Sequence, residues 1–322
     1  MEYQEIRALI QEDFAAVNDV IRQRLESDVV LIDQVSNYIV NSGGKRLRPV
    51  LVLLAAHACR YLGREHIEAA AIIEFIHTAT LLHDDVVDDS ELRRGQETAN
   101  NVWGNQASVL VGDFLYSRSF QMMVEIGDMS VMEVLADATN MIAEGEVLQL
   151  MNYHDPDATE ASYLQIIHRK TAKLFEAGSR IAAILAKSEP EVEQAMKMYG
   201  RHLGASFQLV DDVLDYSVSA DEMGKNMGDD LAEGNPTLPL IYAMQHGTEK
   251  QTQMIRDAIT DGSIEQLPEV IKAVQETGAI KYTAQVAEQE AESARQALRV
   301  LEDSPYKRAL LAVTHFAVSR SV

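Results

Sequence analysis

Two short acidic words carry the residues of this chain that are best suited to chemistry. They read Asp84-Asp85-Val86-Val87-Asp88 and Asp211-Asp212-Val213-Leu214-Asp215. In an α-helix the first and last aspartates of each word lie about 6 Å apart along the axis, on one face. Three carboxylates in an apolar setting repel one another unless hard divalent cations lie among their oxygens, and Mg²⁺ suits such a set. The pattern therefore predicts two clusters of Mg²⁺ ligands whose remaining coordination positions are open to phosphate oxygens.

The flanks of the two words separate this interpretation from a simpler one. A single acidic cluster usually lies on a solvated helix face. Here an apolar stretch precedes each word, residues 70–83 before the first and 203–210 before the second. An EF-hand calcium loop is excluded, because it needs glycine at its sixth position, where this chain has Asp89. We therefore expect each word to end a buried helix.

Basic side chains are clustered despite an acidic composition. The turn Gly43-Gly44-Lys45-Arg46-Leu47-Arg48-Pro49 carries three cations, and Arg93-Arg94 follows the first acidic word. The turn is no Walker A loop, because it lacks the second glycine spacing and the Ser/Thr after lysine. By itself it is either a solvated basic turn or a grip for phosphate, which arginine forks and lysine point charges both bind.

The elements that must position these groups are helices. Hydrophobic residues make up 47% of the 322, glycines number 17 and prolines 7, and apolar residues recur at helical spacing. The chain is predicted to be all-α and to form one domain, 1–322. Expected helices cover residues 5–25, 28–41, 50–61, 66–88, 105–126, 129–151, 160–187 and 190–216, then a loop at 217–237 and helical hairpins from 238 to the end.

Composition excludes several classes of protein. A net charge of -22 argues against a nucleic-acid partner, which would require an extended basic surface. The single cysteine, Cys59, fits a reducing cytosol, and a cytoplasmic location is expected. The acidic N-terminus predicts no signal peptide, and no apolar run is long enough to predict a membrane span.

Several motifs in one order identify a family resemblance. These motifs are, in chain order, Gly43–Pro49, His77, the first acidic word with Arg93-Arg94-Gly95, Lys170-Thr171, Phe207-Gln208 with the second word, Gly224-Lys225-Asn226 and Gly228-Asp229-Asp230-Leu231. Through them the chain resembles the trans-polyprenyl diphosphate synthases over essentially its whole length.

The resemblance implies an active site that contains metal ions and two diphosphates. The fold would be a single large helical bundle of the isoprenoid synthase type around a central active-site cavity. Three Mg²⁺ ions per active site would bridge to an allylic diphosphate. Their ligands would be Asp84, Asp85, Asp88, Asp211, Asp212 and Asp215.

The same resemblance assigns two substrate sites. The allylic diphosphate would be gripped by Arg93, Lys170, Thr171, Gln208 and Lys225, of which Arg93, Lys170 and Lys225 would neutralise the leaving group. Isopentenyl diphosphate would be held by Lys45, Arg48, His77 and Arg94. Taken alone, a histidine on an apolar helix such as His77 is more often a hydrogen-bonded core residue. Asn235 departs from the family, which usually has lysine there, so no diphosphate role is carried over to it.

Product length is predicted from the residues one helical turn before the first word. Ala79 and Thr80 are small where short-chain relatives have a bulky aromatic, which implies a long product. Met123 and Leu135 are candidates for the floor of the chain-length tunnel, or they are plain core residues.

The resulting hypothesis is a prenyltransferase that adds isopentenyl diphosphate repeatedly to an allylic primer such as farnesyl diphosphate. An eight-unit product for the ubiquinone side chain is expected, with a nine-unit product as the alternative. A class I terpene cyclase, a non-catalytic subunit of a heteromeric synthase and a purely structural helical bundle are the other readings. A homodimer is expected, as is transient membrane contact during product release.

Overall fold

The computed structural model describes residues 1–41, 44–93, 95–217 and 228–319. Most of them lie in helices, so the all-α prediction is confirmed. The strands of the described residues form one small antiparallel hairpin, in which Leu92 pairs with Glu97 and Arg93 with Gln96.

The elements follow one another in a simple order. Before the second acidic word they are α1 (Tyr3–Leu9), α2 (Gln11–Leu25), α3 (Val30–Asn41), α4 (Leu47–Ala58), α5 (Glu65–Val87), β1 (Leu92–Arg93), β2 (Gln96–Glu97), α6 (Ala99–Trp103), α7 (Asn105–Ile126), α8 (Met129–Asn152), α9 (Glu160–Ile167), the π-helical turn η1 (His168–Ala172), α10 (Lys173–Leu185) and α11 (Pro190–Asp215). After it come α13 (Asp229–Ala232), α14 (Leu238–His246), α15 (Glu249–Asp261), α16 (Leu267–Glu276), α17 (Ala279–Ala297), the 3₁₀ turn η2 (Leu298–Val300) and α18 (Pro305–Ser319).

The chain divides into two compact units. The first comprises Met1–Thr139, Leu174–Met198 and Ala297–Val313, and the second Asn140–Lys173, Tyr199–Gln296 and Thr314–Val322. The single-domain organisation expected from the sequence stays a prediction.

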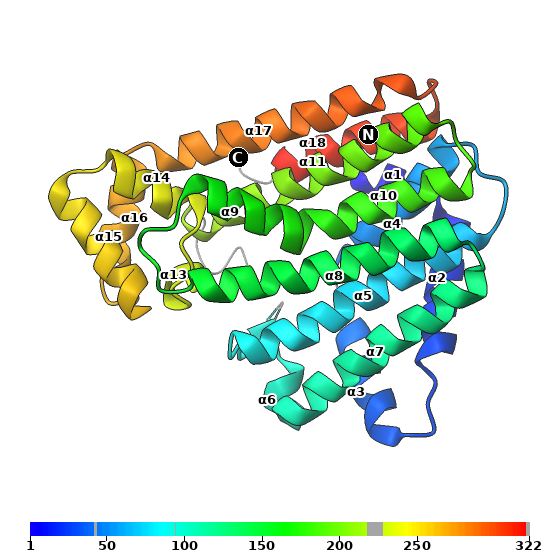
Figure 1. Ribbon diagram of the computed structural model, residues 1–322, viewed down its shortest axis with the longest axis horizontal. Coiled ribbons are helices and arrows are strands. Elements are labelled where there is room, and N and C mark those ends of the chain that lie inside the picture. Colours follow the sequence, from blue (N-terminus) through cyan, green and yellow to red (C-terminus); the bar gives the residue numbers. More distant parts are fainter. Residues whose placement is uncertain (42–43, 94, 218–227, 320–322) are drawn as a thin grey trace. The chain divides into compact units, whose positions relative to one another are not determined.

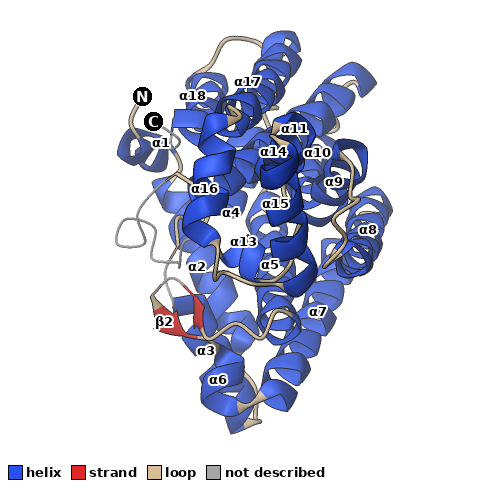
Figure 2. Cartoon of the chain, turned by 90° about the vertical axis from the view of Figure 1, so that its left-hand side faces the viewer, coloured by secondary structure: helices blue, strands red, loops and turns tan. Residues whose placement is uncertain are grey.

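The first unit is built around α5. This helix packs against α2, α4 and α7, and its apolar residues are buried on nearly every side (Figure 1). A buried hydroxyl ties two of these helices together, because Ser108 of α7 donates to the Leu82 carbonyl of α5 over 2.8 Å. The hairpin β1–β2 is anchored on α3 through Tyr38, whose hydroxyl donates to the Glu97 carbonyl over 2.8 Å (Figure 2). The C-terminal end of α5, where the first acidic word lies, is thus held by a rigid core.

The second unit contains the second acidic word and the π-helical turn. Its core includes Tyr163, Ile167, Leu209 and Val210, so the apolar face of α9 packs against α11. The turn η1 lies unusually close to α8 at Gly145. A Cβ at that glycine would lie 2.8 Å from the backbone nitrogen of Lys170 and 2.9 Å from the Arg169 Cβ. Glycine is therefore required where α8 passes the turn that carries Lys170.

Three local predictions from the sequence were wrong. The helix expected at 5–25 is two helices, because the backbone turns at the buried Ile10, which has φ -124° and ψ 22°. The segment through Arg93, expected to be a polar loop, contains the strand hairpin, and the loop expected at 217–237 contains the short helix α13. Local propensity does not predict these elements, because tertiary packing decides them.

Among the residues that the structure describes, no helix is both long enough and apolar enough to cross a bilayer.

The close approach at Gly145 leads to a test with two opposed outcomes. Gly145→Ala is expected to lower the free energy of unfolding by about 1–3 kcal/mol, because the added methyl meets backbone that cannot move aside cheaply. Helix propensity alone would raise it by about 1 kcal/mol. Urea unfolding measures whether Gly145→Ala lowers or raises the free energy of unfolding. The control is Ala143→Ser, at an exposed position of α8. A stabilised Gly145→Ala protein would contradict the packing described.

Candidate active site

The first acidic word forms the last turn of α5, as the sequence predicts. The Asp88 amide donates to the Asp84 carbonyl over 2.8 Å, and α5 ends at Val87. Asp84 and Asp88 are half-buried, whereas Asp85 is 0% exposed. A helix C-terminus carries partial negative charge, so carboxylates placed there increase the local demand for cations.

The buried Asp85 receives a counter-charge from Arg93 on β1. The Asp85 Oδ1 accepts from the Arg93 Nε over 2.6 Å and lies 2.5 Å from Nη2. The side chain of Asn100 donates to the Asp85 carbonyl over 3.1 Å. The hairpin therefore holds the guanidinium of Arg93 against the first word, as required for a residue predicted to neutralise a leaving group nearby.

Two residues predicted for isopentenyl diphosphate lie together in the first unit. The Arg48 Nη1 of α4 and the His77 Nε2 of α5 are 2.9 Å apart. Arginine can only donate, so His77 accepts through Nε2 and carries its proton on Nδ1. The guanidinium of Arg48 also lies over the ring of Phe175, 4.5 Å from the centroid. Lys45, just before α4, is exposed.

The second acidic word ends α11 and has a different arrangement. Asp212 is 2% exposed, and its carboxylate accepts from the Tyr163 hydroxyl and, over 2.8 Å, from the Gln208 amide. The Gln208 oxygen accepts from the Thr171 hydroxyl over 3.0 Å. Thr171, Gln208 and Asp212, all predicted site residues, thus form one hydrogen-bonded chain within the second unit.

Burial controls the protonation of this word. Burial, followed by the negative charges of Asp230 and Asp211, raises the pKa of Asp212 to about 8, although the hydrogen bonds from Tyr163 and Gln208 act to lower it. Burial, together with the Asp212 charge, also raises the pKa of Tyr163, which therefore remains a hydrogen-bond donor.

Asn235 helps to fix Asp230, the carboxylate that acts on Asp212. Its backbone amide donates to the Asp230 carbonyl over 2.8 Å, and its side chain lies 3.4 Å from the Asp230 Oδ1. A lysine at position 235 would add a cation near this carboxylate. Asparagine instead leaves the electrostatic field of Asp230 acting on Asp212.

Lys170 lies in the π-helical turn η1. Its Nζ donates to the Gln149 side chain over 2.6 Å and forms an ion pair of 2.6 Å with Glu146. Single π-turns inserted between α-helices occur often at functional sites, because the extra residue redirects neighbouring side chains. The side chain of Lys170 extends from this turn toward α8, whereas that of Thr171 contacts Gln208 of α11.

The candidate tunnel residues are mostly core residues of the first unit. Ala79, Met123 and Leu135 are at most 1% exposed, and the Thr80 hydroxyl donates to the His77 carbonyl over 2.8 Å. These positions fit either a tunnel or a plain core, so their assignment stays a prediction.

The structure groups the predicted residues into two sets. The first unit contains the first word, Arg93, Lys45, Arg48 and His77, and the second unit contains the second word, Lys170, Thr171 and Gln208. That both sets serve one active site remains a prediction. Arg94 and Lys225 lie outside the described residues.

Sequence reasoning assigned no role to several partners of these residues. Asp230 lay within a recognised motif, and Glu146 and Gln149 share a helix face, so a search for carboxylates and amides near lysine could have found them. Tyr163 and Phe175 had no such signal, because their contacts join segments far apart in the chain.

The donor set fits a hard divalent cation. Every side chain of the two words that could act as a ligand offers carboxylate oxygens, and each word contains an aspartate at least 98% buried. Buried carboxylates need compensation by cations or protons. Arg93 supplies part of it for the first word, and the raised pKa of Asp212 supplies it for the second.

Comparisons with known proteins agree with this chemistry. The sequence matches the family model described as polyprenyl synthetase over residues 29–277. It is 54% identical to octaprenyl diphosphate synthase of Escherichia coli K12, covering 99% of both chains. It is 49% identical to an all-trans-nonaprenyl-diphosphate synthase (geranyl-diphosphate specific) of Rhodobacter capsulatus, covering 98% of both.

A solved structure extends the likeness to three dimensions. The crystal structure of a polyprenyl synthase from Caulobacter crescentus CB15, complexed with calcium and isoprenyl diphosphate, aligns with a TM-score of 0.96 at 41% identity, covering 100% of this chain and 98% of that one. These matches confirm the family, the fold type and the enzyme class that the motifs predicted.

The raised pKa of Asp212 predicts a pH dependence of the metal-free protein. The folded carboxyl keeps its proton up to about pH 8, whereas the unfolded one ionises near pH 4. The free energy of unfolding is therefore expected to fall as pH rises from about 4 to about 8, by on the order of a few kcal/mol from this group.

In Asp212→Asn the side chain at position 212 is neutral throughout this pH range. The variant is therefore expected to lose the part of the pH dependence of the unfolding free energy that Asp212 contributes. Urea unfolding in chelator at a series of pH values measures it, with the exposed Asp257→Asn as the control. If the unfolding free energy of Asp212→Asn changed with pH as much as that of the wild-type protein, the assignment of the proton to Asp212 would be refuted.

Proposed function

The chain belongs to the polyprenyl synthetase family, and we propose that it is a long-chain all-trans polyprenyl diphosphate synthase that makes octaprenyl diphosphate. The proposal rests on one observation above all. Each DDxxD word ends a helix with a buried aspartate bonded to a residue predicted to grip the leaving diphosphate, Arg93 at Asp85 and Gln208 at Asp212. The 54% identity to an octaprenyl diphosphate synthase supports the product length.

The proposed reaction joins two diphosphates head to tail. The allylic C–O bond breaks to give an allylic cation and diphosphate, the isopentenyl double bond attacks the cation, and a proton is lost to the departing diphosphate. Bound Mg²⁺ would neutralise the diphosphate charge, held by Asp84, Asp85, Asp88, Asp211, Asp212 and Asp215.

The described side chains have distinct tasks in this scheme. Arg93, already oriented by Asp85, adds positive charge at the leaving group, and Lys170 does so from η1. Thr171 and Gln208 orient the same diphosphate by hydrogen bonds. Arg48 grips isopentenyl diphosphate with its guanidinium fixed by His77 and Phe175, which limits the entropy lost on binding.

Assembly and location are part of the proposal. Exposed apolar residues on α7, Leu110 at 65%, Phe120 at 38% and Val124 at 64%, support a homodimer. The exposed Leu150 and Met151 of α8 support transient membrane contact as the apolar product leaves. A cytoplasmic location fits the thiol of Cys59, whose pKa burial raises to about 11, which leaves it unreactive.

The product itself tests the function. With farnesyl diphosphate, labelled isopentenyl diphosphate and Mg²⁺, the enzyme is expected to form mainly an eight-unit product, and chelation should abolish it. Chromatography of the dephosphorylated products measures the length. A nine-unit product would favour the alternative supported by the 49% identical relative. Cyclic products without incorporated isopentenyl units would indicate a terpene cyclase and overturn the proposal.

Separate diphosphate sites predict separate kinetic defects. Arg48→Ala is expected to raise KM for isopentenyl diphosphate about 10- to 100-fold, as the loss of a charge-assisted hydrogen bond gives, with a smaller change for the primer. Lys225→Ala should impair use of the allylic primer instead. Steady-state kinetics decide, with Arg180→Ala, which breaks an ion pair with Glu193, as the control. Equal defects toward both substrates in both variants would contradict the partition.

The tunnel prediction concerns Ala79. Ala79→Tyr is expected to shorten the products while the enzyme still condenses at a measurable rate, because the ring lies about 8 Å along α5 before Asp84. Since Ala79 is 0% exposed, Thr80→Phe serves as a second, less buried substitution, and thermal unfolding checks both folds. An unchanged product profile from both folded variants would mean that the chain grows by another route.

A further inference from the structure

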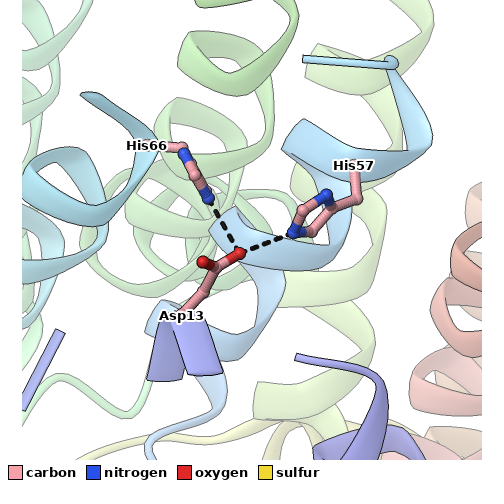
Figure 3. A group of neighbouring side chains, drawn as sticks. All are labelled: Asp13, His57 and His66. Atoms are coloured by element: carbon pink, nitrogen blue, oxygen red, sulfur yellow. Dashed lines mark hydrogen bonds and ion pairs between the residues drawn. The ribbon is translucent and has the colours of Figure 1, made fainter. Parts of the chain in front are cut away.

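Three side chains outside the proposed active site converge in the first unit. Asp13 of α2, His57 of α4 and His66 of α5 point toward one another (Figure 3). The Asp13 Oδ2 lies 2.6 Å from the His57 Nε2 and 3.0 Å from the His66 Nε2. One ligand atom from each lies within 4.8 Å of the other two.

The donor types differ from those of the acidic words. Two imidazole nitrogens with one carboxylate oxygen form a set that Zn²⁺ and related first-row ions prefer, whereas Mg²⁺ prefers oxygen alone. In a tetrahedral zinc site neighbouring donors are about 3.3 Å apart, given metal-ligand distances of about 2.0–2.1 Å. To reach that separation, the Asp13–His57 distance of 2.6 Å must open by about 0.7 Å and the Asp13–His66 distance of 3.0 Å by about 0.3 Å, which side-chain rotation supplies.

The surroundings hold the two rings in place. The ring of Tyr306 stacks on His57, with centroids 4.6 Å apart and planes at 17°. The ring of Tyr61 meets His66 edge-on, with centroids 5.5 Å apart. The three donors come from three helices that pack together, which fixes their separation. Such support is what a preorganised metal site needs.

An ion could enter from solvent. The side chains of Asp13 and His57 are 22% and 26% exposed, while that of His66 is 4% exposed. Three protein donors with one open side leave a fourth position for water.

The buried side of His66 sets the expected affinity. Binding through Nε2 places the ring proton on Nδ1, and among the described residues the buried His66 Nδ1 has no hydrogen-bond partner. Outer partners of metal-bound histidines typically contribute about 10- to 100-fold in affinity. Micromolar rather than nanomolar binding is therefore expected.

We propose that Asp13, His57 and His66 form a binding site for a divalent transition-metal ion of the zinc class, which ties α2 to α4 and α5. His66 and Asp84 are both on α5, about 27 Å apart along its axis, so the site is distinct from the first acidic word. An ion bound to the folded state alone also stabilises it.

Titration with Co²⁺ in excess Mg²⁺ tests the proposal on the full-length protein. A four-coordinate site with two nitrogens absorbs strongly in the visible range, whereas six-coordinate oxygen sites absorb weakly. One strongly absorbing Co²⁺ per chain is expected, with micromolar affinity and displacement by Zn²⁺. Added Zn²⁺ should also raise the thermal unfolding temperature.

Two variants remove a ligand in different ways. His57→Phe keeps a ring to stack on Tyr306, and Asp13→Asn keeps an acceptor for both histidines. Each is expected to weaken the strongly absorbing site about 100-fold or more, because a ligand is worth more than an outer partner. His202→Gln is the matched control, since His202 pairs with one carboxylate, Glu290 at 2.7 Å, and should leave the spectrum unchanged.

The outcomes separate the metal site from a purely hydrogen-bonded group. No strong absorption in the wild-type protein, or the same absorption in folded His57→Phe and Asp13→Asn, would overturn the proposal. The three residues would then only join the helices by hydrogen bonds.

Discussion

Carboxylates gathered at the ends of long helices are the constraint on which the rest of this structure depends. Each acidic word lies in the last turn of its helix, where the helix itself carries partial negative charge. Uncompensated charge there would oppose folding. The protein compensates the two words differently. The guanidinium of Arg93 pairs with Asp85, whereas Asp212 has a raised pKa and accepts hydrogen bonds from Tyr163 and Gln208.

This difference has a functional consequence. If a cation binds at the second word, a carboxyl that keeps its proton until about pH 8 must release it, so metal binding and proton release would be linked there. At the first word Asp85 is instead paired with Arg93. The charge of Asp230, whose carboxylate lies 3.4 Å from the Asn235 side chain, would strengthen this linkage, which gives a physical meaning to the asparagine that departs from the family pattern.

The sequence predicted the helices and the acidic words well, because both depend on local pattern. The helix at residues 105–126 was predicted with its observed ends, since Gly104 and Gly127 flank it with positive φ. The break at Ile10 and the π-turn at Lys170 were missed, because packing rather than local propensity causes them. The resemblance assigned Arg48 and His77 to one substrate site, but it predicted neither their contact nor the packing of the Arg48 guanidinium over the ring of Phe175. Such contacts join residues far apart in the chain and leave no periodic signal.

The proposed function requires that the two acidic words act together on one diphosphate through shared metal ions. Calorimetric binding of an unreactive thiolo analogue of farnesyl diphosphate, with and without Mg²⁺, tests it most directly in Asp84→Asn, Asp211→Asn and the double variant. The account predicts that wild-type binding requires Mg²⁺, that each single variant weakens it about tenfold or more, and that the double variant is weakened by much less than the product of the two single effects. Binding that does not depend on Mg²⁺, or losses that simply multiply in the double variant, would contradict it.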